Sequence, residues 1–405
     1  MKRHFTVSKY FFGLIAFCYV TEGIVDVAVA SVWPVIANAI KAHLSLIGIL
    51  VMVYYLGAVF MSPNTYKIRH CIGTNYTMVL SQICFSTALF LYIIASNIYI
   101  FALGMFVNGM GCGLLEINAS SYVLKAYEAK EESILYGFWG LGSVLGSTVM
   151  VLAINYYPPY KRGFAALIII ILVNIILLLL AKRNWEKQKE TLPDYIINIH
   201  SVTEEEKKTN IKIKDLLKDK KVIFVLCCFF LSQSVIITFN SLVSTIAVSH
   251  KDIYENTAVI VPIIYYTAIF VGRLLFGIIS KRTKVITVLK TNIMVLILLF
   301  TILCIKSLNG FVVCAIMILI GFVASPIIPF MNAYIKEMFD VKYLSALLGY
   351  GDVSGVLGII VISGLTTFVM KMTSIQVVEF IFIVLSIVLY FLLIRIEKEN
   401  IYKRK

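Results

Sequence analysis

Long apolar runs, separated by short polar connectors, fill almost the whole chain. A helix that crosses a membrane needs about 20 apolar residues, because about 30 Å of hydrocarbon must be spanned at about 1.5 Å per residue. Runs of about this length lie at residues 10–38, 45–66, 73–95, 97–124, 133–157, 163–181, 221–248, 257–280, 285–305, 310–335, 343–370 and 374–396. The pattern therefore predicts an all-α membrane protein with twelve transmembrane helices. The first run is too long for a cleaved signal peptide.

One connector, residues 182–220, is much longer than the others and is rich in Lys and Glu. It divides the chain into an N-terminal half of six predicted spans, residues 1–181, and a C-terminal half of six more, residues 221–405. Within the connector, apolar residues between Ile211 and Leu217 predict a short amphipathic helix on the membrane surface. We expect a cytoplasmic linker here, between two six-helix bundles.

The two halves contain a weak internal repeat. Residues 135–146 and 347–358 are identical at five positions when the chain is shifted by 212 residues, and Gly109 meets Gly321 at the same offset. Repeated halves of this kind are typical of transporters, in which two pseudo-symmetric bundles rock about a solute site near the middle of the membrane. The repeat therefore predicts such bundles around a central cavity.

Glycines spaced by four residues recur in the repeated segments, as Gly142 with Gly146 and Gly351 with Gly355. Small residues at this spacing let helices approach closely in a membrane. We expect these glycines to lie at contacts between helices.

Composition and charge agree with a membrane protein. Hydrophobic residues make up 60% of the chain and charged residues only 14%, whereas a soluble protein has roughly 25% charged residues. The net charge of +14 does not indicate nucleic-acid binding, because the basic residues lie in connectors and not on one folded face. We expect no nucleic-acid partner.

The basic residues also predict the orientation in the membrane. Of the 36 Lys and Arg residues, 29 lie on the same side as the termini, in the termini, the connectors and the adjoining parts of the spans. Six lie in connectors on the other side, and Arg273 is counted separately within a span. Connectors rich in Lys and Arg face the cytoplasm. We therefore predict a multi-pass protein of the cell membrane with both termini in the cytoplasm.

No pattern for enzyme chemistry is found. The eight cysteines lie mostly in apolar runs without metal-ligand or disulfide spacing, and the five histidines lie in termini or connectors. A phosphate-binding loop is also absent from the sequence. We expect no enzyme activity, no metal and no cofactor, and the lack of an ATP site favours secondary transport.

The residues at 272–282, GRLLFGIISKR, resemble the signature loop of the major facilitator superfamily, and the segment 57–73 resembles a degenerate copy of it. The fourth span has spaced glycines followed by an acid and an amide, a pattern that resembles the fourth span of the fucose–galactose–hexose proton symporters. The residues of this pattern are Gly109, Gly111, Gly113, Glu116 and Asn118. The resemblance implies the two-bundle fold of that superfamily, with a small solute and protons as ligands. Ser147 departs from relatives that have a proline after the fifth-span glycines.

Acidic residues within the predicted spans are candidates for proton coupling. A charged side chain at the centre of a bilayer costs about 2.5 kcal/mol or more, so such residues usually have a function. Glu116 matches the acid of the resembling family, and Asp26 lies in the middle of the first span. We predict that these two carry the coupled proton. Structural roles are the alternative for both, and we give Glu22, Asp352 and Glu379 less weight.

A gate on the cytoplasmic side is predicted from the signature loops. Arg273 begins the loop after the eighth span, and Asp352 lies at a comparable depth in the eleventh span. A bidentate arginine–carboxylate pair would tie these spans together, with snorkelling of Arg273 to the interface as the alternative. Arg69 in the equivalent loop of the N-terminal half is a further gate candidate.

Polar and aromatic residues within the spans are candidates for solute binding. Aromatic faces stack on sugar rings and amides bind hydroxyl groups. The predicted set is Asn108, Asn118, Trp139, Gln233, Asn240, Tyr265 and Asn332, with Tyr266 as a neighbour.

The leading functional hypothesis is proton-coupled symport of a hexose or a similar small polar solute by a monomeric carrier. The first alternative is an exporter or facilitator of amphipathic compounds of the multidrug type. A non-transporting membrane receptor is the second alternative, and it is disfavoured by the small size of the linker.

Overall fold

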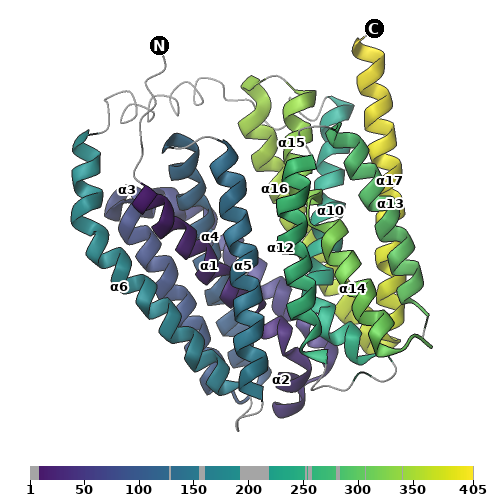
Figure 1. Ribbon diagram of the computed structural model, residues 1–405, viewed down its shortest axis with the longest axis horizontal. Coiled ribbons are helices and arrows are strands. Elements are labelled where there is room, and N and C mark those ends of the chain that lie inside the picture. Colours follow the sequence, from purple (N-terminus) through teal and green to yellow (C-terminus); the bar gives the residue numbers. More distant parts are fainter. Residues whose placement is uncertain are drawn as a thin grey trace.

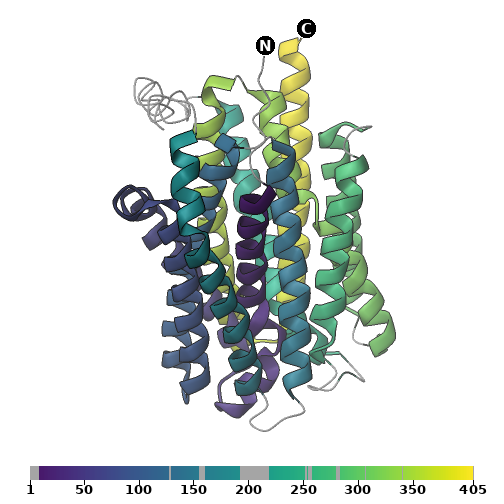
Figure 2. The same cartoon turned by 60° about the vertical axis from the view of Figure 1, so that its left-hand side comes forward.

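The computed structural model describes residues 9–126, 129–154, 160–191, 219–250, 253, 258–279, 283–305, 307–339 and 341–404. Within these residues the secondary structure is helical, without strands. The long helices run roughly along one common direction (Figure 2), and the start of the first described helix and the end of the last one lie towards the same end of the molecule (Figure 1). We call this end the terminal side and the other end the opposite side.

The N-terminal half consists of α1 (Lys9–Ser31), α2 (Trp33–Ala39), the short 3-10 turn η1 (Leu44–Leu46), α3 (Ile47–Ile94), α4 (Ile98–Ala126), α5 (Ala129–Ile154) and α6 (Lys161–Thr191). The C-terminal half consists of α10 (Lys220–Val248), α12 (Val261–Ile279), α13 (Val285–Leu303), α14 (Gly310–Ala324), α15 (Ile327–Met338), α16 (Val341–Met372) and α17 (Ile375–Arg404). Every predicted span has a helical counterpart. In the described residues, eleven stretches are long and apolar enough to cross a membrane, and Val261–Phe276 of α12 is a shorter apolar helix.

Prolines divide two of the predicted spans. The first span ends as α1 at Ser31 and continues as α2, with Pro34 in the first turn of the new helix, where the missing N–H costs no intrahelical hydrogen bond. The tenth span changes from α14 to α15 at Ser325 and Pro326. Each of these spans is therefore made of two helices.

The second and third spans form one helical run, α3, with Gly73 at the bend between them. Gly73 has a φ of 84°, a backbone conformation that glycine adopts without a steric cost. Helix α6 continues to Thr191, which is beyond the predicted end of its span at residue 181. The predicted amphipathic helix at 211–217 lies outside the described residues.

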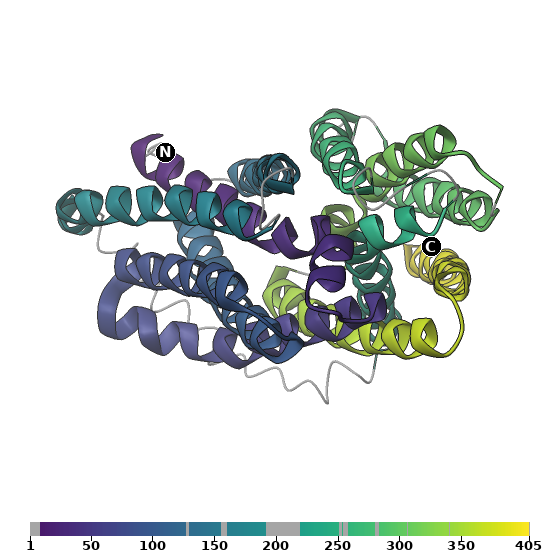
Figure 3. The same cartoon turned by 90° about the horizontal axis from the view of Figure 1, so that it is seen from below.

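The helices form the two expected bundles. Figure 1 shows α1 to α6 on one side and α10 to α17 on the other, and the view from below shows the same two groups next to each other (Figure 3). The same pairing recurs in each bundle, because α5 packs along α1 and α16 packs along α10. The structure thus has two pseudo-symmetric bundles of six membrane spans.

Glycines permit these equivalent helix pairs, as predicted. A Cβ added to Gly142 would lie 2.1 Å from the carbonyl oxygen of Val20, and one added to Gly146 would lie 2.6 Å from that of Ile24. In the other half, a Cβ on Gly355 would meet the side chain of Gln233 at 2.2 Å. A larger residue at position 142 or 146 would therefore push α5 from α1, whereas one at position 355 would displace the Gln233 side chain.

The two halves are joined on the opposite side of the molecule. The hydroxyl of Ser244 in α10 donates a hydrogen bond to the carbonyl oxygen of Ala30 in α1. The hydroxyl of Thr367 in α16 donates to the carbonyl oxygen of Ser45 at 2.9 Å. Helices α5 and α12 meet nearer the middle of the molecule, where Gly140 faces Phe270. The space between the halves is therefore bordered by direct contacts on the opposite side.

Candidate functional site

A pocket lies between the two halves, next to the contacts that join them. The empty space in the pocket, together with the open solvent at its mouth, amounts to about 570 Å³. Helices α1, α3, α4 and α5 contribute one wall, and α10 and α12 contribute the other. Its polar and aromatic lining residues are Asp26, Tyr54, Tyr55, Trp139, Asn240, Ser241 and Tyr266.

Asp26 is the acidic residue of this pocket, and its carboxylate is held from two sides. The hydroxyl of Tyr54 in α3 donates to Oδ1 at 2.8 Å, and Nε1 of Trp139 in α5 donates to Oδ2 at 3.1 Å. Hydrogen bonds to a charged acceptor are short and strong. Asp26 is thus fixed in one orientation, half-buried at the edge of the pocket.

Trp139 connects the Asp26 carboxylate to the C-terminal half. The guanidinium carbon of Arg273 lies 5.1 Å from the centroid of the Trp139 ring, within the range of a cation–π interaction. The ring of Tyr266 meets Trp139 edge to face, with centroids 6.5 Å apart and planes at 81°. One indole therefore touches an acid of its own half and two residues of the other half.

The predicted gate residues lie in different surroundings. Arg273 stacks on Trp139 because α12 packs against α5 at this level, and Asp352 accepts a hydrogen bond of 3.4 Å from Nε2 of Gln233. The pairing of Arg273 with Asp352 stays a prediction. Arg69 lies in α3, half-buried and outside the pocket lining.

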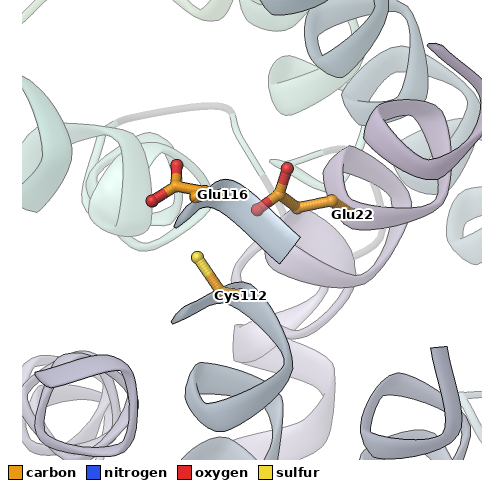
Figure 4. A group of neighbouring side chains, drawn as sticks. All are labelled: Glu22, Cys112 and Glu116. Atoms are coloured by element: carbon orange, nitrogen blue, oxygen red, sulfur yellow. The ribbon is translucent and has the colours of Figure 1, made fainter. Parts of the chain in front are cut away.

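A second acidic group lies between α1 and α4 (Figure 4). The carboxylates of Glu22 and Glu116 and the thiol of Cys112 have their polar atoms within 4.8 Å of one another. Glu22 is only 1% exposed, and neither of its oxygens has a hydrogen-bond partner among the described residues. Glu116 is exposed. Figure 4 shows the Glu22 side chain reaching from its helix towards Glu116.

This arrangement determines the charge that the group tolerates. Two carboxylates at this separation repel each other strongly where water is scarce, so the doubly charged form is costly. One proton shared by Glu22 and Glu116 removes the repulsion and gives the buried Glu22 oxygens a donor. The geometry of the group is thus compatible with one proton shared between the two carboxylates.

The structure brings part of the predicted solute set together. Trp139 and Asn240 line the pocket, and so does Tyr266. The hydroxyl of Tyr265 donates to the side-chain oxygen of Asn240, and that of Tyr266 donates to its main-chain oxygen at 3.2 Å. Tyr265 is fully buried, so it orients Asn240 and does not itself line the pocket.

The other predicted amides lie away from the pocket lining. Asn118 is fully buried and donates to the carbonyl oxygen of Thr74 at 2.9 Å, which joins α4 to α3. Asn108 is buried, and Asn332 lies half-buried in α15; the side-chain oxygen of each has no hydrogen-bond partner among the described residues. Gln233 packs on Gly355 and bonds Asp352.

Glu379, the acid given least weight from the sequence, is fully buried and faces His250. The distance from Nε2 of His250 to Oε1 of Glu379 is 3.5 Å. No pattern in the sequence indicated this pair, because His250 lies in a connector that is remote from Glu379 along the chain. The pair joins the end of α10 to the start of α17 and lies apart from the pocket.

Sequence reasoning did not single out Tyr54, Tyr55 or Cys112. Tyrosine is abundant in this chain, with 23 residues, so no single tyrosine stands out. A signal did exist for Cys112, since it lies one helical turn before Glu116 and therefore on the same face of α4.

Comparison with known proteins agrees with the fold. The family described as Major Facilitator Superfamily matches residues 15–314. The chain therefore belongs to the major facilitator superfamily, a class of membrane transporters. No curated protein sequence matches the chain.

Two solved structures share this fold over nearly the whole chain. A crystal structure of a point mutant of the nucleoside transporter NupG has a TM-score of 0.70 and 15% identity, and covers 95% of this chain and 99% of that one. A second crystal structure of NupG has a TM-score of 0.70 and 14% identity, and the match covers 96% of this chain and 99% of that one. At this identity the similarity concerns the fold alone. The resemblance to the hexose symporters stays a prediction.

Proposed function

We propose that this protein is a proton-coupled secondary transporter that moves a small polar solute by alternating access. The observation that carries the proposal is the pair of carboxyl groups of Glu22 and Glu116, within 4.8 Å of each other. The pair lies beside a pocket that has its own carboxylate, Asp26. An intramembrane acid pair that is poorly satisfied when ionised is a suitable carrier for one proton.

The pocket supports a solute with a ring and several polar groups. Trp139, Tyr54 and Tyr266 offer aromatic surfaces, and Asn240 and Ser241 offer hydrogen-bonding groups on the facing wall. A hexose, as predicted from the sequence, meets these requirements. A nucleoside meets them equally, and the shared fold with NupG makes nucleosides the second solute class to test.

The proposed cycle uses the two acidic sites in different ways. Glu22 and Glu116 take up one proton, and Asp26 with its aromatic neighbours binds the solute. The loaded halves then rock, so that the pocket opens to the other face of the membrane. Contacts such as Ser244 with Ala30 on the opposite side support a form that opens towards the terminal side. We propose that this side is the cytoplasm, because the termini and the connectors predicted on the same side as the termini contain 29 of the 36 basic residues of the sequence.

The test uses purified protein in liposomes with radiolabelled hexoses and nucleosides. Glu116→Gln keeps hydrogen-bonding groups but cannot release a proton. We expect this variant to exchange solute across the membrane in counterflow at near-normal rates, whereas accumulation driven by a pH gradient is lost. Glu337→Gln is the matched control, because Glu337 is an exposed acid in α15, and it should keep both activities.

Two results would contradict the proposal. If Glu116→Gln still concentrates solute against its gradient, the pair does not carry the proton. If the unmodified protein expels amphipathic compounds when protons enter, the carrier is an antiporter of the multidrug type. Both outcomes are read in the same vesicles.

A further inference from the structure

We propose that Trp139 is a positioning residue that transmits the charge state of Asp26 to the C-terminal half through Arg273. This inference rests on the proposed transport function and adds a coupling element to it. The indole is the side chain through which Asp26 and Arg273 are linked, with Nε1 at 3.1 Å from the carboxylate and the ring face 5.1 Å from the guanidinium carbon.

The hydrogen bond fixes the ring. A tryptophan side chain rotates about two bonds, and an Nε1–H bond to a fixed acceptor selects one orientation of the ring plane. The acceptor is itself fixed, because Tyr54 donates to the other carboxylate oxygen at 2.8 Å. While Asp26 is ionised, the face of Trp139 is therefore held in place for a partner above it.

Arg273 is that partner, and its attraction depends on the same hydrogen bond. Donation of the indole N–H to an anion increases the electron density of the ring, and a cation is attracted to the ring face by that density. Protonation of Asp26, or occupation of its oxygens by a solute donor, weakens the acceptor. The ring then loses both its orientation and part of its attraction for Arg273.

The contact lies where it can act on the rocking motion. Helix α12 runs towards the terminal side, so Arg273 lies two turns nearer that side than Tyr266, which also touches Trp139. The guanidinium stack thus crosses between the halves on the terminal side of the pocket. Its formation and loss favour different arrangements of the two halves.

Asp26 does not titrate in isolation. The titratable and charged side chains that interact around it are Glu22 on α1, Tyr54 and Tyr55 on α3, Cys112 and Glu116 on α4, Tyr266 and Arg273 on α12, and, through Glu116, Asp352 on α16. The test therefore uses variants of Asp26, Trp139 and Arg273 and does not rely on pH alone.

The experiment measures the distance between spin labels on the two halves. Labels at Ala39→Cys and Met372→Cys, two exposed positions on the opposite side, are placed in a full-length protein without its native cysteines. We expect the distance distribution to shift between pH 8 and pH 5. Asp26→Asn should give the low-pH distribution at both pH values, because it removes the ionised acceptor.

Trp139→Phe is the decisive variant, since phenylalanine keeps a ring face for Arg273 but has no N–H. We expect Trp139→Phe to behave like Asp26→Asn, so that the shift in spin-label distance between pH 8 and pH 5, here called the pH response, is at least tenfold smaller than in the parent protein. Arg273→Met should reduce the pH response by a similar factor. The double variant Trp139→Phe with Arg273→Met should lose no more of the pH response than either single variant. Glu337→Gln should leave the pH response intact.

A full pH shift in a folded Trp139→Phe protein would overturn the inference, and so would additive effects of Trp139→Phe and Arg273→Met. The absence of any pH shift in the parent protein would overturn it as well. None of these results touches the counterflow test of Glu116, so failure of this coupling element is distinguishable from failure of the proposed function.

Discussion

Glu22 and Asp26 lie one turn apart on α1, yet their hydrogen-bond surroundings differ, which is why we propose different roles for them. Asp26 has a donor on each carboxylate oxygen, which suits a group that binds solute in its ionised form. Both oxygens of Glu22 are without a hydrogen-bond partner among the described residues, which suits a group that shares a proton with Glu116. Sequence position alone does not distinguish the two acids.

Glu22 should be as important for coupling as Glu116. We expect Glu22→Gln to abolish accumulation driven by a pH gradient while counterflow persists, because the pair then lacks one of its two titrating groups. The double variant Glu22→Gln with Glu116→Gln should be no worse than either single variant, since the two residues act as one unit. Uptake and counterflow in the same vesicles measure this. Unimpaired accumulation by Glu22→Gln would exclude a shared proton.

Tyr54 should contribute to solute affinity through Asp26. Tyr54→Phe removes one donor from the carboxylate and keeps the ring, and a hydrogen bond to a charged group is worth about 1.5–3 kcal/mol. We expect KM to rise about tenfold or more, with a smaller change in maximal rate. Tyr99→Phe, at an 81% exposed position, is the control and should not change KM. Equal KM values for the two variants would remove Tyr54 from the site.

At the scale of the helices, the contact between α1 and α5 depends on glycine. Gly142 faces the carbonyl oxygen of Val20, and a Cβ there would lie at 2.1 Å. The backbone of a packed helix cannot yield by that distance without moving the helix. This contact also positions Trp139 against Asp26, because both residues lie on the same pair of helices.

Gly142→Val should therefore destabilise the protein by about 1–3 kcal/mol or more, as overpacking does. We expect a lower melting temperature in detergent and reduced abundance in the membrane. Gly137→Ala is the control in the same helix, because a Cβ at Gly137 meets no atom of the described residues within 4 Å. A normal melting temperature for Gly142→Val would show that α1 and α5 are not closely packed.

The spans could be predicted from the sequence because twenty apolar residues in a row have few alternatives to a membrane helix. The positions where a span breaks into two helices could not be predicted with the same accuracy. Pro34 and Pro326 divide two spans into separate helices, although a proline within an apolar run is also compatible with a kink in a continuous helix. Gly73 marks the bend in α3, where only the short connector indicated a change of direction.

At the scale of the whole molecule, the two-bundle fold followed from the spans, the long linker and the repeat. The site followed only in part. Trp139, Asn240 and Asp26 were predicted individually, but their partners were not, because contacts such as Glu22 with Glu116 depend on how helices rotate and cross. Apolar surface on all sides of a membrane helix leaves that rotation undetermined by the hydrophobic pattern.

The orientation of the molecule can be tested by labelling from outside. Cysteines placed at Lys41 or Lys161 in a protein without native cysteines should react with an impermeant thiol reagent on intact cells. A cysteine at Glu205 in the linker should react only after the cells are opened. These expectations follow from the distribution of 29 basic residues against six. Labelling of a cysteine at position 205 on intact cells would contradict the predicted orientation.

We propose that one proton crosses the membrane with the solute, carried by Glu22 and Glu116. The most direct measurement uses proteoliposomes that contain a trapped pH-sensitive dye and no initial pH gradient. Addition of the transported solute outside should acidify the interior, and Glu116→Gln should admit the solute in radiolabelled form without any acidification. Solute entry into vesicles of the unmodified protein at constant internal pH would contradict the account.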